Sequence, residues 1–177
     1  IMLDHVINFI NLIGHWGYLV IFLIVMLECQ ALLGLFMPGE SLVLAGGFLA
    51  EQGLLDPGVL LFVISAAAIL GDSIGYQVGR HLGRGWLIQH GRRFGFRQEY
   101  LDRVDRFLEH HGGKAVFASH FMHLMRAMMP FAAGASRMRY WQFLIFNAVG
   151  CIVWATTFIT FGYFAGASWH VAAKWVG

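Results

Sequence analysis

Four ionisable side chains stand inside stretches of this sequence that are otherwise apolar. They are Glu28, Glu40, Asp72 and Arg126. A charged side chain at the centre of a helix in lipid costs about 2.5–3.5 kcal/mol or more, so such groups usually face a cavity, a partner or a ligand. Arg126 is the only Lys or Arg in residues 115–136, and its rigid fork of donors matches the oxygens of a phosphate group. These residue types predict an anion site at Arg126, with acidic groups available to pair with it.

Two histidines stand close to Arg126 in the sequence. His120 and His123 share one face, at the spacing i and i+3, if this segment is helical. One interpretation is proton transfer, because histidine titrates near physiological pH and burial can bring a glutamate into the same range. The other is a divalent-metal site formed by the two histidines with Glu28, Glu40 or both. The spacing matches no strong metal motif, and both interpretations stay open.

Asp72 and the two cysteines have simpler interpretations. Asp72 lies within Gly71-Asp72-Ser73, where it either caps or packs against a helix, and it is kept as an additional candidate. Cys29 and Cys151 lie in apolar runs. Free cysteine behaves as a small hydrophobic residue, so both are interpreted as packing residues with no disulfide framework.

The composition of the chain excludes most classes of water-soluble protein. Of its 177 residues, 58% are hydrophobic and 12% are charged, and the mean hydropathy is +0.64. A soluble domain carries about 25% charged residues, and a chain of this size buries only about 70% of its surface. The polar surface is therefore too small for a soluble enzyme, a nucleic-acid-binding protein or a disordered protein. We expect an all-α integral membrane protein in a single membrane domain.

Apolar segments of sufficient length predict three transmembrane helices, at 6–27, 58–79 and 140–165. About 20 apolar residues are needed to cross a bilayer. Two further apolar segments, 28–51 and 115–136, are divided by charged residues into runs too short to cross. Proline and glycine interrupt both segments, and lipid cannot satisfy the backbone groups that a broken helix frees. We expect each of these two segments to form a re-entrant hairpin.

The segment 80–114 differs sharply in composition, with eight Lys or Arg and four Asp or Glu. Apolar residues at helical spacing predict an amphipathic surface helix over 97–111. Positive charge collects in the cytoplasmic loops of membrane proteins. We therefore place this basic linker in the cytoplasm.

The elements on the two sides of the basic linker occur in the same order. The motif G-Y-x-x-G ends the span 58–79 and recurs at 162–166, and each copy follows a broken segment that contains proline. With 80–114 in the cytoplasm, the first hairpin enters the membrane from outside and the second from inside, so the two halves are inverted. Paired broken segments in inverted halves are typical of a transporter with its binding site near the membrane midplane.

Several motifs of this sequence resemble those of the DedA family of bacterial membrane proteins, whose domain is also called the VTT domain. The resemblance covers about residues 6–166. In the first half the motifs are Glu28, L-F-M-P-G-E at 35–40, G-G-F-L-A at 46–50 and G-D-S-I-G-Y-Q-V-G-R at 71–80. In the second half they are Phe121, Arg126, P-F-A-A-G-A-S-R-M at 130–138, Phe143, Asn147, Gly150 and Trp154. The resemblance implies two opposed re-entrant hairpins, in agreement with the inverted halves.

The resemblance also implies a place and a function. DedA-family proteins lie in the bacterial inner membrane and support envelope integrity and the proton motive force. Some are implicated in moving undecaprenyl phosphate or phospholipids between leaflets. The implied functional residues are Glu28, Glu40 and Arg126, the last as the second arginine of an R-F-x-P-x-x-R segment. His120 stands where the family has the first arginine, and His123 where it has the proline, so a titratable group replaces a permanent cation here.

Together these features predict a proton-coupled flippase of a lipid phosphate that supports envelope homeostasis. In this hypothesis Arg126 and His120 bind the head group, while Glu28 and Glu40 carry the proton. Asp72 and His123 are additional candidates. The expected partners are anionic membrane lipids and protons, with a homodimer permitted by the glycine-rich faces and with no nucleic acid.

Two other functions remain open. One is a metal-dependent membrane enzyme that acts on a lipid phosphate, with its metal held by His120, His123 and Glu28 or Glu40. The other is a transporter of a small ion or oxyanion. No cofactor is predicted apart from that metal. The chain begins at Ile1 rather than at a methionine and stops before the last transmembrane helix expected in the family, so we also expect both ends to be trimmed.

Overall fold

The computed structural model describes residues 16–27, 39–90 and 98–176, and all regular structure in these ranges is helical. The described part of the predicted first span 6–27 is the apolar helix Trp16–Leu27. The rest of that span, Glu28 and the first arm of the hairpin predicted at 28–51 lie outside the described residues. Within the described ranges the prediction of an all-α chain is confirmed.

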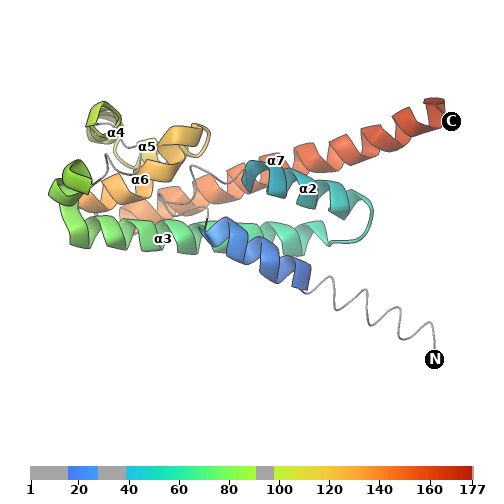
Figure 1. Ribbon diagram of the computed structural model, residues 1–177, viewed down its shortest axis with the longest axis horizontal. Coiled ribbons are helices and arrows are strands. Elements are labelled where there is room, and N and C mark those ends of the chain that lie inside the picture. The colour runs from blue at the N-terminus through green and yellow to red at the C-terminus, as the bar shows by residue number, and fades with distance from the viewer. Residues whose placement is uncertain (1–15, 28–38, 91–97, 177) are drawn as a thin grey trace.

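Two long helices form the axis of the molecule (Figure 1). They are α3, Pro57–His90, and α7, Tyr140–Val176. Their apolar parts, Pro57–Gly83 and Tyr140–Ser168, contain 27 and 29 residues and are long enough to cross a membrane. Both agree with the spans predicted from the sequence. Gly83 ends the apolar part of α3, because its φ of 71° and ψ of 173° interrupt the helix.

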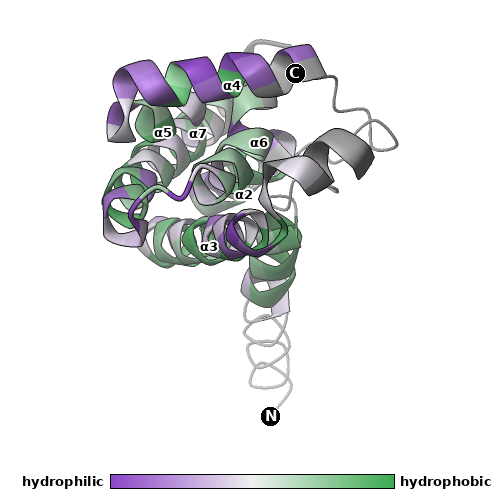
Figure 2. Ribbon diagram, turned by 90° about the vertical axis from the view of Figure 1, so that its left-hand side faces the viewer, coloured by the Kyte–Doolittle hydropathy of each residue, from purple (hydrophilic) through white to green (hydrophobic). Residues whose placement is uncertain are grey.

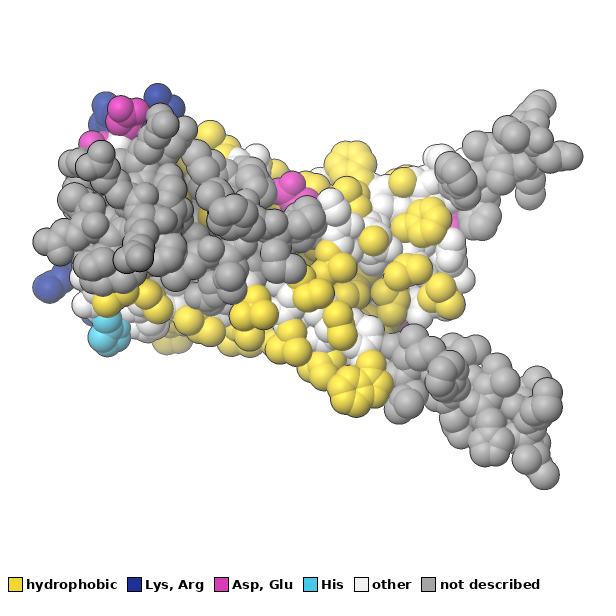
Figure 3. Space-filling view, in the orientation of Figure 1, with side chains coloured by type: hydrophobic (Ala, Val, Ile, Leu, Met, Phe, Trp, Pro, Cys, Tyr) yellow, Lys and Arg dark blue, Asp and Glu magenta, His cyan; other side chains and the backbone are white. Residues whose placement is uncertain are grey.

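Large apolar side chains cover the outside of both long helices. Phe62 on α3 is 74% exposed, and Ile145 and Phe164 on α7 are 60% and 64% exposed. Figure 3 shows a broad band of hydrophobic side chains across one face, with Lys and Arg gathered at one end. Exposed apolar surface of this extent marks a membrane or partner contact. This distribution supports a protein that is surrounded by lipid.

Four shorter helices pack on this axis (Figure 1). Helix α4 lies at the charged end and is amphipathic, as Figure 2 shows by its hydrophilic outer side, and it coincides with the helix predicted at 97–111. Its Val104 and Leu108 are buried, while Glu109 is exposed. The four helices are α2, Gly39–Glu51; α4, Gln98–His111; α5, Gly113–Ser119; and α6, His123–Ala135.

The segment predicted as the second hairpin, 115–136, is broken near its start rather than at its proline. Helix α5 ends at Ser119, a turn spans residues 120–122, and α6 begins at His123. Pro130 lies inside α6. Its missing N–H leaves the carbonyl of Arg126, four residues earlier, without its usual intrahelical donor. Two short helices separated by a turn are present, and their depth in a membrane stays a prediction.

Helices α2 and α6 of the two broken segments each pack on the long helix of the other half. Helix α2 lies along α7, and α6 lies along α3. Glycine makes both approaches possible, because a Cβ would collide with a backbone carbonyl across each contact. The colliding pairs are Gly47 with Ile159 and Gly162 with Leu44, and Gly79 with Phe131 and Gly134 with Tyr76. The inverted repeat itself stays a prediction, and the two G-Y-x-x-G tyrosines differ: Tyr76 is buried and Tyr163 is exposed.

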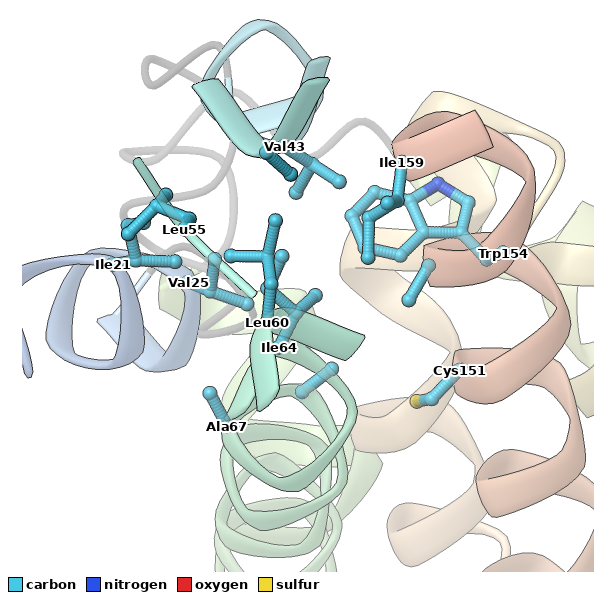
Figure 4. Packing of buried hydrophobic residues seen from close by; sticks show 13 residues of the cluster. Ile21, Val25, Val43, Leu55, Leu60, Ile64, Ala67, Cys151, Trp154 and Ile159 are labelled. Atoms are coloured by element: carbon cyan, nitrogen blue, oxygen red, sulfur yellow. The ribbon is translucent and has the colours of Figure 1, made fainter. Parts of the chain in front are cut away.

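The interior divides into two hydrophobic clusters. One joins the helix Trp16–Leu27 to α2, α3 and α7, and Figure 4 shows Val43 of α2 beside Ile159 and Trp154 of α7. The other lies under α4, where Tyr76 stacks on Phe143 with ring centroids 4.7 Å apart. The polar residues of the interior lie along α7 and the helices that face it.

Candidate functional site

Helix α7 carries polar side chains on its buried face. Asn147, Cys151 and Trp154 follow one another at spacings of four and three residues, so they share this face. All three side chains are 0% exposed. Figure 4 shows Cys151 and Trp154 on the side of α7 toward the packed helices. This face of α7 is the wall on which the site is built.

Two side chains from other parts of the chain, both able to ionise or to bind a metal, lie beside Cys151. Asp72 comes from α3, and His120 from the turn that follows α5. The Nε2 atom of His120 lies 3.2 Å from Sγ of Cys151 and 3.6 Å from Oδ2 of Asp72. The same sulfur lies 3.5 Å from that carboxylate oxygen. With 2%, 4% and 0% exposure respectively, Asp72, His120 and Cys151 form a buried cluster.

The position of the His120 ring is fixed from two sides. Its Nδ1 lies 3.0 Å from the carbonyl oxygen of Val116, which only an N–H at Nδ1 can satisfy. The lone pair of the neutral ring is then on Nε2, the atom that faces Asp72 and Cys151. On the other side Gly150 leaves room for the ring, because a Cβ there would lie 2.7 Å from Nδ1.

Arg126 is held on the same wall by an aromatic contact. Its guanidinium carbon lies 3.7 Å from the centroid of the Trp154 ring, a cation–π geometry. The arginine is 8% exposed. A cation this deeply buried in an apolar surrounding needs compensating negative charge, from the chain or from a ligand.

Two residues on this buried face of α7 have polar atoms that lack partners among the described residues. These are the side-chain amide of Asn147, at both its oxygen and its nitrogen, and Nε1 of Trp154. Buried polar groups are nearly always hydrogen-bonded to protein or to ordered water. These donors and this acceptor lack partners in the described ranges and lie on both sides of Cys151, which suits a site that receives a polar ligand or water.

Comparison with known proteins decides the family. The VTT domain matches residues 37–164. Protein DedA of Escherichia coli is 35% identical over 155 residues, which are 86% of this chain and 70% of that protein. The chain belongs to the DedA family of membrane proteins.

Other DedA-family relatives agree with a membrane location. An uncharacterized membrane protein of Synechocystis is 39% identical over 88% of this chain and 70% of its own length. Inner membrane protein YohD of Escherichia coli is 31% identical over 94% of this chain and 78% of its own length. No solved structure matches the chain significantly.

The residues predicted from the sequence of this DedA-family protein fall into three groups. Arg126 and His120 lie in the buried site, and Asp72, kept only as an additional candidate, lies there too. Glu40 stands in the first turn of α2 and is half-buried. Glu28 and the side chain of His123 lie outside the described residues.

The site also contains a residue that sequence reasoning missed. Cys151 was interpreted as a packing residue, yet its sulfur contacts both His120 and Asp72. One signal was available, since Cys151 lies on one helical face with Asn147 and Trp154, two residues that carry the family resemblance. Among the described residues of this DedA-family protein, Asp72, His120 and Cys151 form the group that could hold a metal ion, with ligand atoms within 4.8 Å of one another.

Proposed function

We propose that this protein moves an anionic lipid phosphate, undecaprenyl phosphate or a phospholipid, between the leaflets of the bacterial inner membrane. One observation carries the proposal. Within a membrane domain, Arg126 is 8% exposed and its guanidinium rests on the face of Trp154. The aromatic contact orients the arginine, and the buried location makes its attraction for an anion stronger than it would be in water.

The head group and the chains of a lipid would use different surfaces. The phosphate would enter between the helices to reach Arg126, with Nε1 of Trp154, which lacks a partner among the described residues, as a further donor. The chains would stay on the apolar outer surface. A groove of about 530 Å³ runs along the outer face of α3, lined by Leu70, Ile74 and Val78 among others. Such an arrangement lets a polar group cross the membrane without drawing the lipid chains through the core.

We infer proton coupling because the buried positive charge of Arg126 must be balanced by a negative charge at every stage of transport. In the proposal Arg126 pairs alternately with a glutamate and with the lipid phosphate. Protonation of the glutamate releases the arginine for the phosphate, and deprotonation restores the pair. Glu40 fits this role because it stands in the first turn of α2, the helix that packs on α7, which carries Trp154. Glu28 is proposed for the same role on the family resemblance alone.

The test is lipid flipping in proteoliposomes that contain a fluorescent lipid phosphate in one leaflet. Wild-type protein should accelerate flipping, and a proton gradient should change the rate. Arg126→Gln should lower the rate at least tenfold, because the neutral amide cannot hold the phosphate. Glu40→Gln should flip lipid at a rate that no longer responds to the proton gradient. Arg139→Gln, at an exposed arginine before α7, is the matched control and should behave as wild type.

Two results would contradict the proposal. One is equal flipping by the wild type and Arg126→Gln, both well folded by size-exclusion chromatography. The other is transport of inorganic phosphate that lipid phosphate does not compete with, which would favour a small-oxyanion transporter. A neutral lipid of the same chain length should not be moved, because it offers nothing to the guanidinium.

A further inference from the structure

We propose that Asp72, His120 and Cys151 bind one divalent transition-metal ion, with zinc as the ion of best fit. The bound ion would connect α3 of the first half, through Asp72, to two elements of the second half. These are the turn between α5 and α6, through His120, and α7, through Cys151. This proposal does not depend on the transported substrate, and of the metal ligands suggested by the sequence spacing it keeps only His120.

The distances between the three ligand atoms match a tetrahedral ion. Zinc binds sulfur at about 2.3 Å and nitrogen or oxygen at about 2.0–2.2 Å, so tetrahedral neighbours lie about 3.3–3.6 Å apart. The three separations here are 3.2 Å from nitrogen to sulfur, 3.5 Å from sulfur to oxygen and 3.6 Å from nitrogen to oxygen. An ion could be placed at bonding distance from all three atoms with only small side-chain shifts.

The orientation of His120 is the one that a metal ligand needs. Ligating histidines usually donate their second ring N–H to a carbonyl or carboxylate, which fixes the tautomer. His120 does this through Nδ1 and the carbonyl oxygen of Val116. The lone pair on Nε2 is thereby turned toward the carboxylate and the sulfur. Gly150 keeps this ring position open, since any side chain there would collide with it.

The three facing atoms can also bind one cation together. In the forms that bind a metal, Nε2 of the imidazole, the carboxylate of Asp72 and the thiolate sulfur all present lone pairs to one point. A metal ion satisfies all three at once and displaces the thiol proton, since the thiolate is the form that binds a metal.

A nucleophilic cysteine triad fits the geometry less well. In such triads the thiol and the acidic group hydrogen-bond to opposite nitrogens of the imidazole. Here Asp72 and Cys151 both face Nε2, while the carbonyl of Val116 occupies Nδ1. The sulfur is also fully buried. Convergence of all three ligand atoms on one point is the property of a metal site.

The composition of the ligand set selects the type of metal. A thiolate and an imidazole favour zinc and its neighbours among transition metals over magnesium or calcium, which prefer oxygen ligands. Three protein ligands leave a fourth position, as in zinc sites that exchange a water. Asn147, one helical turn before Cys151, has an amide without a partner among the described residues and lies on the same face of α7.

The experiment measures metal in the full chain, purified in detergent through a tag without histidines after growth with added zinc. Elemental analysis should find about one zinc per chain in the wild type. Asp72→Asn, His120→Ala and Cys151→Ala should each reduce it at least tenfold. Cys29→Ala and His111→Ala are the matched controls, because they remove another cysteine and an exposed histidine, and they should retain the metal.

A second measurement does not depend on variants of the three proposed ligands, which could fail to fold. Cobalt loaded in place of zinc should give the wild type a thiolate-to-cobalt charge-transfer band, and Cys29→Ala should retain that band. Wild-type protein with neither zinc nor the band after loading would overturn the proposal. So would a zinc content that Cys151→Ala leaves unchanged. Neither readout involves transport, so failure here and failure of the flippase proposal are separate outcomes.

Discussion

Gly150 shows how a single position decides the arrangement of the buried site. Without a side chain at this point of α7, the His120 ring lies against the helix and reaches Cys151. The buried arginine of the site could be predicted from the sequence, because one cation within a long apolar segment is unusual. The partners of His120 could not, since Asp72 and Cys151 stand 48 residues before it and 31 residues after it. Only the folded helices bring them together.

Replacing Gly150 by alanine should therefore disturb His120 directly. The new Cβ would lie 2.7 Å from Nδ1, so the ring would move and lose its bond to the carbonyl of Val116. We expect a loss of about 1–3 kcal/mol in the free energy of unfolding, as for other overpacked interiors. Thermal unfolding in detergent measures it. Gly17→Ala is the control, because nothing lies within 4 Å of that position, and an equal effect of the two changes would contradict the account.

At the scale of elements, the structure is determined by how closely α2 approaches α7 and α6 approaches α3. The two long spans were predictable, because length and hydropathy suffice to identify them. The continuity of α6 through Pro130 could not be predicted, because proline lacks a backbone N–H and can equally well mark a break in a helix. The turn came at residues 120–122 instead. Tertiary packing decides which long helix α2 and α6 each contact. Glycines at the contacts permit these approaches, and the local sequence pattern does not reveal them.

The glycine contacts should carry a large share of the stability. Gly162→Ala places a Cβ against the carbonyl of Leu44, a backbone atom that cannot move aside without shifting α2. We expect the free energy of unfolding to fall by about 1–3 kcal/mol or more. Gly85→Ala on α3 should change it by much less, because nothing lies within 4 Å there. Similar melting temperatures for the two variants would show that the α2–α7 contact is looser than described.

The whole molecule has an apolar central part and one charged end. Helix α4 and the C-terminal end of α3 lie at that end, and the turn between α2 and α3 lies at the other (Figure 1). The composition predicted a membrane protein, and the DedA-family relatives agree with that prediction. The orientation in the membrane rests on the positive charge of residues 80–114 and is a proposal.

Cysteine labelling tests this orientation. Glu109 on α4 and Gln52 in the α2–α3 turn are both exposed. In a Cys29→Ser background, Gln52→Cys should react with a membrane-impermeant maleimide in intact spheroplasts. Glu109→Cys should react only after the membrane is permeabilised. The buried Cys151 should stay unlabelled in both. The reverse pattern would place α4 outside and invert the proposed topology.

The central claim is that Arg126 receives the phosphate of a lipid inside the helix bundle. The most direct measurement is photo-crosslinking with a lipid phosphate that carries a diazirine next to its head group, followed by mass spectrometry of the peptides. We expect adducts on α6 or α7 at residues beside Arg126 and Trp154, and their loss in Arg126→Gln. Adducts that are confined to the exposed outer faces of α3 and α7, or that persist unchanged in Arg126→Gln, would contradict it.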